Sequence, residues 1–291
     1  MIILVALSLT LGMTACYWPG LPNASILKTE YPVVRMEWRD GRHLGVVHLQ
    51  KSRPASWVNL AGVNKLAVNA IMVSEDWAFF QHKGYDPKQI REALNRDLND
   101  RKFTRGASTI TQQVARNVFL DQDKTVVRKL KELALAVQME RKLNKQKILE
   151  VYLNIAEFGD SLYGIGPAAH YYFDKSPSEL NAKEGAFLAM LLPSPKRYSV
   201  SFRAHRLTEY ARDTIETILD KMQQAHFITV DQKMAEVERP LSWEKVPGAG
   251  EAPTPLPTED PEGPSGDEDE AAGTALPPPP GRPANNSTDS I

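Results

Sequence analysis

The stretch VNKLAVNAIMVSEDWAFFQHKGYDP, residues 63–87, opens the part of the chain that decides the fold. Its first half is an amphipathic run, so we expect a helix that ends near Glu75. Asp86 with Pro87 is typical of a helix N-cap followed by proline at the first helical position. The helical pattern continues to about Gln232 with few strand signals. Capping boxes predict two later starts, at Ser176 with Glu179 and at Asn181 with Glu184.

Upstream of this helical part, residues 33–50 read VVRMEWRDGRHLGVVHLQ. Asp40 and Gly41 separate two Val-rich runs with alternating residues, which is the short-range signal of a β-hairpin. The sequence therefore predicts a mainly α fold with a small N-terminal β-hairpin.

The composition is that of a globular protein. Of 291 residues, 42% are hydrophobic and 24% are charged, which excludes a disordered or fibrous chain as a whole. The single cysteine, Cys16, allows no internal disulfide and no thiolate cluster for zinc or iron and sulfur. Any metal must therefore rest on oxygen or imidazole ligands.

Charge and proline divide the chain unevenly. The net charge is -1, but residues 247–291 hold nine acidic residues and one base, so residues 1–246 carry about seven more bases than acids. A cationic body favours anionic partners such as phosphates, anionic lipids or nucleic acid. Eleven of the 21 prolines lie in the same C-terminal stretch, which predicts disorder. We expect four parts: residues 1–18, an anchor or signal; 19–56, a linker with the hairpin; 57–240, the helical domain; and 241–291, an acidic Pro-rich tail.

The N-terminal segment MIILVALSLTLGMTAC, residues 1–16, is uncharged and should engage a membrane. It lacks the basic start of a normal signal peptide, which is consistent with a truncated or misassigned start. Three interpretations stay open: an uncleaved anchor, a lipoprotein signal ending at Cys16, and a cleaved signal. Each places the residues after Trp18 outside the cytoplasm.

A first candidate cluster lies at the predicted end of the first helix. It comprises Glu75, Asp76, Phe80, His82, Gly84 and Asp86. A helix C-terminus disfavours an ionised carboxylate, and with Trp77 and Phe79 beside it the pKa of Glu75 should rise, which suits a general base. The alternative is a solvated acidic pair at a helix end.

A second cluster is RGASTITQQVARN, residues 105–117. A helix opening after Gly106 offers free backbone N–H groups and the hydroxyls of Ser108 and Thr109, an arrangement that suits a phosphate. Three side chains one turn later can converge on a polar ligand: Gln112, Gln113 and Arg116. The alternative is ordinary N-capping of a surface helix.

A third cluster is KTVVRKLKELALAVQMERKL, residues 124–143. Arg128 and Lys129 precede Glu132 by four and three residues, so each pair shares a helix face. The same side continues into Leu135 and Met139. The alternative is a surface ion pair of small energetic value.

These three clusters are followed by KILEVYLN, residues 147–154, and GIGPAAHYYFDK, residues 164–175. In order and spacing the five blocks, over about residues 57–200, resemble glycosyltransferase family 51, the transglycosylase domain of bifunctional penicillin-binding proteins. The chain looks most like the monofunctional biosynthetic peptidoglycan transglycosylases. No SxxK with companion SxN and KTG follows, so we expect no transpeptidase site, and we interpret SILK at residues 25–28 as chance.

The resemblance implies a lysozyme-like helical glycosyltransferase domain that polymerises lipid II into β-1,4 glycan strands with release of polyprenyl diphosphate. Glu75 falls on the family's base, which deprotonates the acceptor 4-hydroxyl. Glu132 falls on its second glutamate and helps to organise the diphosphate, with Arg128, Lys129 and Lys131 nearby.

By the same matching, substrate contacts fall on Ser108, Gln112, Gln113, Arg116 and Lys124. A divalent ion, Mg²⁺ or Mn²⁺, would bridge the diphosphate to Glu75 or Glu132. The chain departs from the family at Ala107, where a second glycine is common, and at Arg116, where the family has lysine. We expect Asn154 to be a structural side chain.

The expected partners are lipid II, the nascent glycan chain, membrane lipids and cell-wall synthesis proteins, with no nucleic acid. We expect the catalytic domain on the periplasmic face of the inner membrane. Lipid contact is predicted at Leu98 and Phe103 with the bases Arg96, Arg101, Lys102 and Arg105. Two other functions stay open: a catalytically silent lipid II-binding scaffold and a glycan-cleaving, lysozyme-like enzyme.

Overall fold

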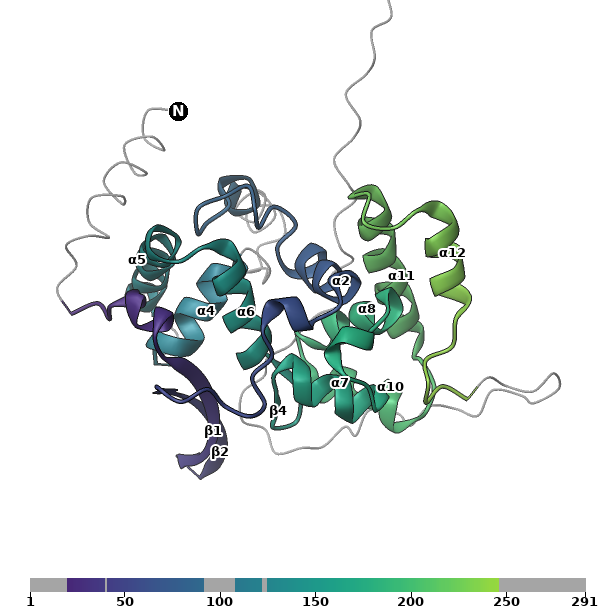
Figure 1. Cartoon of the computed structure of the whole chain (residues 1–291), viewed down its shortest axis with the longest axis horizontal. Coiled ribbons are helices and arrows are strands. Elements are labelled where there is room, and N and C mark those ends of the chain that lie inside the picture. The colour runs from purple at the N-terminus through teal and green to yellow at the C-terminus, as the bar shows by residue number, and fades with distance from the viewer. Residues whose placement is uncertain (1–19, 40, 92–107, 122–124, 246–291) are drawn as a thin grey trace, which may run out of the picture. The chain divides into compact units, whose positions relative to one another are not determined.

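The computed structural model describes residues 20–39, 41–91, 108–121 and 125–245 (Figure 1). The predicted membrane segment, residues 1–18, lies outside the described residues. So do Lys124, the predicted lipid-contacting stretch around Phe103, and the acidic part of the predicted tail, residues 246–291.

The N-terminal hairpin is present as predicted. Strand β1 (Tyr31–Arg39) pairs antiparallel with β2 (Arg42–Gln50), in a register that runs from Tyr31 opposite Gln50 to Arg39 opposite Arg42. The hairpin packs against helices of the main body, β1 on α6 and β2 on α4.

The body is helical, which confirms the predicted mainly α class. Its α-helices are α2 (Lys65–Glu75), α4 (Ile110–Phe119), α5 (Val126–Lys142), α6 (Lys145–Ile155), α7 (Ile165–Phe173), α8 (Ala182–Leu191), α9 (Pro195–Tyr198), α10 (Val200–Arg203), α11 (Glu209–Gln224) and α12 (Val230–Glu238), and its short 3₁₀ helices are η1 (Ala24–Lys28), η2 (Leu60–Gly62) and η3 (Pro177–Glu179). Across the described part of the chain, no helix is long and apolar enough to cross a membrane.

A second small hairpin was not predicted. Strand β3 (Glu157–Gly159) pairs with β4 (Leu162–Tyr163) between α6 and α7. Strands of three and two residues are too short to show an alternating pattern, so the sequence offered no signal for them.

The predicted helix starts are confirmed, one of them with a change. The Asp86 carboxylate accepts from the backbone N–H of Lys88 at 2.8 Å, as an N-cap does. The Asn181 and Glu184 box opens α8. The Ser176 and Glu179 box also forms, but the helix it opens is the three-residue η3 rather than an α-helix.

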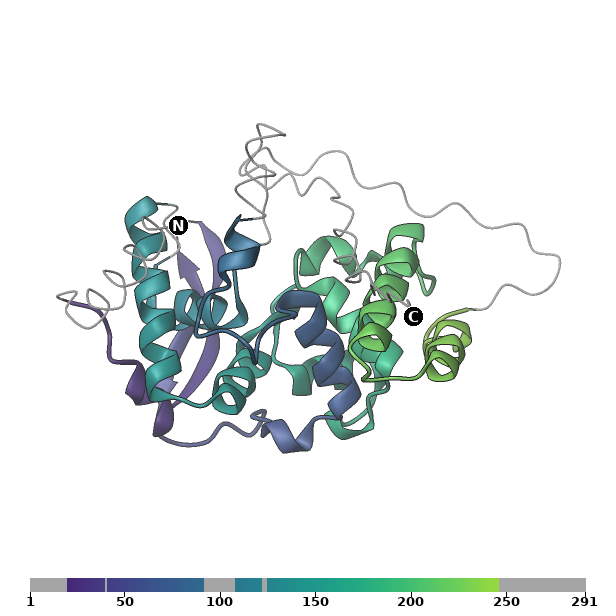
Figure 2. The ribbon, with the colours of Figure 1, turned by 90° about the horizontal axis from the view of Figure 1, so that it is seen from above.

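The helices form two groups that share one apolar core (Figures 1 and 2). Helices α2, α8 and α11 contact one another, whereas α4 packs against α5 and α6. Glu75 ends α2, and Gln113 lies on α4. The first candidate residue therefore lies where the two groups meet.

The packed domain extends beyond the predicted boundary at residue 240. Leu241 is buried, and the Trp243 ring lies 5.3 Å from the Phe187 ring and 5.5 Å from the Phe202 ring. Residues 241–245 thus belong with the domain rather than with the tail, because the last aromatic side chain of the sequence packs into the core.

Helices α2 and α8 approach closely at Gly185, where a Cβ would lie 2.4 Å from the Ala67 Cα. We expect Gly185→Ala to lower the free energy of unfolding by about 1–3 kcal/mol, because overpacking here outweighs the helix propensity of alanine. The matched control is Gly62→Ala, where the nearest atom is 3.4 Å away and the expected change is within about 0.5 kcal/mol. Urea unfolding measures both, and a Gly185→Ala variant as stable as the native chain would contradict the close contact.

Candidate active site

Glu75 is the last residue of α2, as the amphipathic run predicted. Gln113 of α4 donates from Nε2 to Glu75 Oε2 at 2.8 Å, and the Tyr152 hydroxyl of α6 lies 3.4 Å from the same oxygen. Three helices therefore converge on one carboxylate.

The pKa of Glu75 is raised, in the predicted direction. Burial of the carboxylate is the largest cause, and the hydrogen bonds from Gln113 and Tyr152 oppose it. Trp77, which was expected to contribute, is 43% exposed, whereas Phe79 is buried. The surrounding helices, rather than the neighbouring tryptophan, supply the apolar environment.

Two cationic side chains act on Glu75 from a distance. Arg116 lies near enough to lower the pKa of Glu75, and Glu75 raises the pKa of Lys221 on α11, although burial lowers the pKa of that lysine overall. A base flanked by cations can exchange a proton without leaving an isolated buried charge.

Tyr152 and Lys221 were missed by sequence reasoning. Tyr152 lies in the KILEVYLN block, where its position on the buried face of a helix was the available signal. No local signal pointed to Lys221, since it lies 146 residues beyond Glu75 on a different helix.

Asp76 connects the start of α4 to the end of α2 through hydrogen bonds. Its side chain is fully buried, and Oδ2 accepts from the backbone N–H of Ile110 at 3.0 Å, while Oδ1 lies 2.9 Å from His82 Nε2. Ile110 is the first residue of α4, where free N–H groups and the helix dipole favour a carboxylate. The interpretation of Glu75 and Asp76 as a solvated acidic pair is therefore wrong.

The loop after Glu75 also touches α5. Gly84 has φ of +93°, and a Cβ there would lie 2.9 Å from the Ala136 carbonyl oxygen. The Thr109 hydroxyl donates to the Gly84 carbonyl at 2.8 Å. Glycine is required here by both its positive φ and the close backbone approach, and the loop thereby fixes α4 against α5.

The two neighbouring glutamines have different surroundings. Gln112 is 3% exposed, and its Oε1 accepts from the Thr109 N–H at 2.9 Å as the second half of a capping box. Gln112 and Arg116 lie one turn apart on α4 and thus on one face, but the Gln112 amide oxygen is used in the cap, so its predicted contact with a ligand stays a prediction. Gln113 carries the contact with Glu75.

Glu132 is fully buried and holds both predicted cations. Arg128 Nη1 lies 2.9 Å from Oε2, and Lys129 Nζ lies 2.5 Å from Oε1. Leu135 and Met139 continue its side as buried residues. Because the Glu132 carboxylate is fully buried, the interpretation as an ordinary surface pair is wrong. Removing either cation would leave part of a buried charge uncompensated.

Lys129 links this acidic group to α4. Its Nζ also donates to the Ser108 hydroxyl at 2.8 Å, just before the α4 N-cap. The buried Arg128 Nε has no hydrogen-bond partner among the described residues. The guanidinium of Arg128 and the ammonium of Lys129 are groups of the kind that donate to an anion such as a phosphate.

Helical spacing separates Lys131 from the Glu132 group. It lies next to Glu132 in sequence and thus about 100° away around α5, whereas Arg128 is one turn from Glu132. Its predicted substrate contact stays a prediction.

These side chains do not by themselves form a set of ligands for the predicted bridging metal ion. Both carboxylate oxygens of Glu132 hold cations, and the part of the chain with described positions contains no group of three histidine, cysteine, aspartate or glutamate side chains suited to a metal ion. A divalent ion at Glu75 or Glu132 stays a prediction, and no chemical step below is routed through a metal.

Asn154 has the predicted structural role. Its amide oxygen accepts from the Val58 N–H at 2.8 Å, and its Nδ2 donates to the carbonyl oxygens of Val58 and Glu150. It fixes the segment before η2 to α6 and points to no reacting group.

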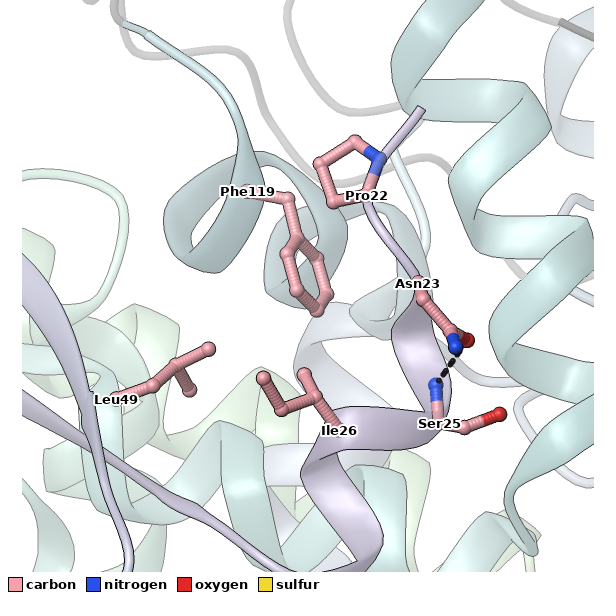
Figure 3. Close-up of a pocket in the computed structure, with 6 residues that line it drawn as sticks. All are labelled: Pro22, Asn23, Ser25, Ile26, Leu49 and Phe119. Carbon is pink, nitrogen blue, oxygen red and sulfur yellow. Dashed lines mark hydrogen bonds between the residues drawn. The ribbon is translucent and has the colours of Figure 1, made fainter. Parts of the chain in front are cut away.

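A pocket of about 450 Å³ lies apart from these residues (Figure 3). It is lined by Pro22, Asn23, Ser25, Ile26, Leu49 and Phe119, which come from the η1 region, β2 and the end of α4. None of the predicted site residues lines it.

Comparison with known proteins gives a consistent result. A family model described as transglycosylase matches residues 40–223. A biosynthetic peptidoglycan transglycosylase of Yersinia pseudotuberculosis is 37% identical over 66% of this chain and 79% of its own length, and one of Nitrosomonas eutropha is 39% identical over 54% and 64%. Penicillin-binding protein 1A of Aquifex aeolicus is 33% identical over 83% of this chain, which spans only 33% of that relative.

The raised pKa of Glu75 predicts a pH-dependent cost to stability. The folded state holds this proton more tightly than the unfolded state, so stability falls as pH rises from 4.5, the ordinary value, through the folded pKa. Glu75→Gln should therefore be more stable than the native chain at pH 7.5 and equally stable at pH 4, as measured by urea unfolding.

The control for this measurement is Glu179→Gln. Hydrogen bonds from Ser176 lower the pKa of Glu179, so its stabilising contribution is present at neutral pH and is lost in acid. The two variants should therefore change stability at pH 7.5 in opposite directions. A Glu75→Gln variant that is less stable at pH 7.5 would contradict the burial of an ionised carboxylate.

Proposed function

The chain belongs to the transglycosylase family and is a peptidoglycan glycosyltransferase, and we propose that it joins lipid II units into β-1,4 glycan strands with release of polyprenyl diphosphate. One observation carries the assignment of residues. The start of α4 and the residue before its N-cap connect two glutamates, half-buried Glu75 through Gln113 and fully buried Glu132 through Ser108 and Lys129.

Glu75 acts as the general base in this proposal. It removes the proton from the acceptor 4-hydroxyl as that oxygen attacks the anomeric carbon of the growing chain, which inverts the configuration there. Burial raises the pKa of Glu75 toward neutral pH, which suits a general base. The hydrogen bond from Gln113 fixes the orientation of Oε2. Tyr152 supports the same oxygen from α6.

Arg128, Lys129 and Ser108 receive the leaving diphosphate. Negative charge grows on the diphosphate as the glycosidic bond to it breaks, so fixed cations stabilise the transition state more than the ground state. Glu132 holds both cations in place before the substrate arrives.

The remaining matched residues complete the proposed substrate contacts. Arg116 lies near Glu75 and is suited to a sugar or phosphate group between the two centres. Contacts of Lys124, Lys131 and Gln112 with the substrate, and a bridging Mg²⁺ or Mn²⁺, are further parts of the proposal that need separate tests. We place the reaction at the outer face of the cell membrane, where lipid-linked substrates and other cell-wall synthesis proteins meet.

Glu75→Gln is expected to reduce polymerisation about 10²- to 10⁴-fold, because the amide cannot accept the hydroxyl proton. The assay uses purified protein, labelled lipid II and a gel that resolves glycan length. The matched control is Glu238→Gln on α12, which changes an exposed carboxylate. Lipid II left intact by the native chain would favour a silent lipid II-binding scaffold, and shortening of preformed glycan would favour a cleaving enzyme.

Glu132→Gln is expected to reduce the same activity about 10²-fold or more, because Arg128 and Lys129 lose the charge that holds them. Circular dichroism of the variant checks that it folds. Turnover close to that of the native chain would remove Glu132 from the mechanism and leave the assignment of Glu75 intact.

A further inference from the structure

The first two turns of α5 expose apolar side chains. Val126 is 79% exposed, Val127 is 53% exposed and Leu130 is 42% exposed. In the described domain, α5 lies at an edge in both views (Figures 1 and 2), with η1 and α4 as its main contacts. Large aliphatic side chains gathered at one exposed helix start usually mark an interaction surface.

Charge borders this apolar surface on both sides. At about 100° per residue, Val126, Leu130 and Val127 occupy one arc of α5, Lys129 lies at one border of the arc, and Lys131 lies at the other. The first turn contains no acidic residue. An apolar arc between two lysines is the pattern of a helix that lies in the interface of an anionic bilayer.

Arg128 and Glu132 occupy the opposite side of the same two turns. Lys129 belongs to both sides, because it borders the apolar arc and contacts Glu132 and Ser108. The surface that faces outward and the group that would receive the diphosphate therefore lie back to back on one helix start.

We propose that Val126, Val127 and Leu130, the α5 lipid face, insert into the headgroup region of an anionic phospholipid bilayer and hold the domain there. The value of this docking for catalysis rests on the proposed function: it brings Arg128 and Lys129 to the depth at which the diphosphate of a prenyl-linked substrate lies. Apolar burial supplies attraction, and the bordering lysines add electrostatic attraction to anionic lipid.

A site-specific probe tests the docking without any substrate. An environment-sensitive fluorophore is placed on the full chain at Leu130→Cys, or at Val126→Cys as a second variant, with the native Cys16 replaced by Ser. The matched control is Met234→Cys on α12, where the native side chain is 58% exposed. Vesicles contain phosphatidylglycerol and phosphatidylethanolamine, and no lipid II.

One quencher in the lipid and one in the water distinguish a bilayer-inserted face from an exposed or covered one. A lipid-borne nitroxide should quench the probes at positions 126 and 130 much more than the probe at 234, and replacing phosphatidylglycerol by phosphatidylcholine should weaken that quenching. Probes at 126 and 130 that respond only to aqueous iodide overturn the proposal. Probes shielded from both quenchers also overturn it, because another part of this chain or a second copy then covers the face.

An activity comparison tests the consequence. Val126→Ser with Leu130→Ser should lower polymerisation in vesicles about tenfold. In detergent micelles, where the domain does not need to dock on a bilayer, activity should stay within about twofold of native. Val230→Ser with Met234→Ser, an exposed apolar pair on α12, should match the native chain in both. An equal loss in detergent overturns the link to the bilayer. If the native chain forms no polymer at all, the proposed function fails while the quenching result still decides the docking.

Discussion

The buried carboxylate of Asp76 is the constraint on which the site depends. It accepts a hydrogen bond from the backbone N–H of Ile110, the first residue of α4, and contacts His82 in the loop that follows α2. A carboxyl group with no exposed surface is tolerated only when its hydrogen bonds are made, so this contact leaves α4 little freedom to slide. With α4 fixed, Gln113 meets Glu75 and Ser108 meets Lys129.

Burial gives the proposed base its proton affinity and makes the fold less stable at neutral pH. The carboxylate of Glu75 is desolvated by α4 and α6, and only partly compensated by Gln113 and Tyr152. A more complete set of donors would stabilise the ionised form and lower the pKa, which would weaken the base. The large shared core of the two helix groups offsets this local cost.

Local patterns were reliable where a residue's neighbours in sequence are also its neighbours in space. The hairpin, the end of α2 at Glu75, the Asn181 cap and the pairing of Arg128 and Lys129 with Glu132 all follow from contacts within a few residues. The strands β3 and β4 were too short to leave a periodic signal. The cap made by Gln112 was not predicted, because a capping box and a binding site use the same residue types.

The sequence by itself determined the helical class, the hairpin and the helix starts, because helix periodicity and turn chemistry are local properties. Only the tertiary structure decided that Asp76 is a buried link, that Gln113 rather than Gln112 reaches Glu75, and that Tyr152 and Lys221 approach the same carboxylate. These depend on how α2, α4, α6 and α11 pack. Packing joins side chains up to 146 residues apart, a separation at which no local pattern carries information.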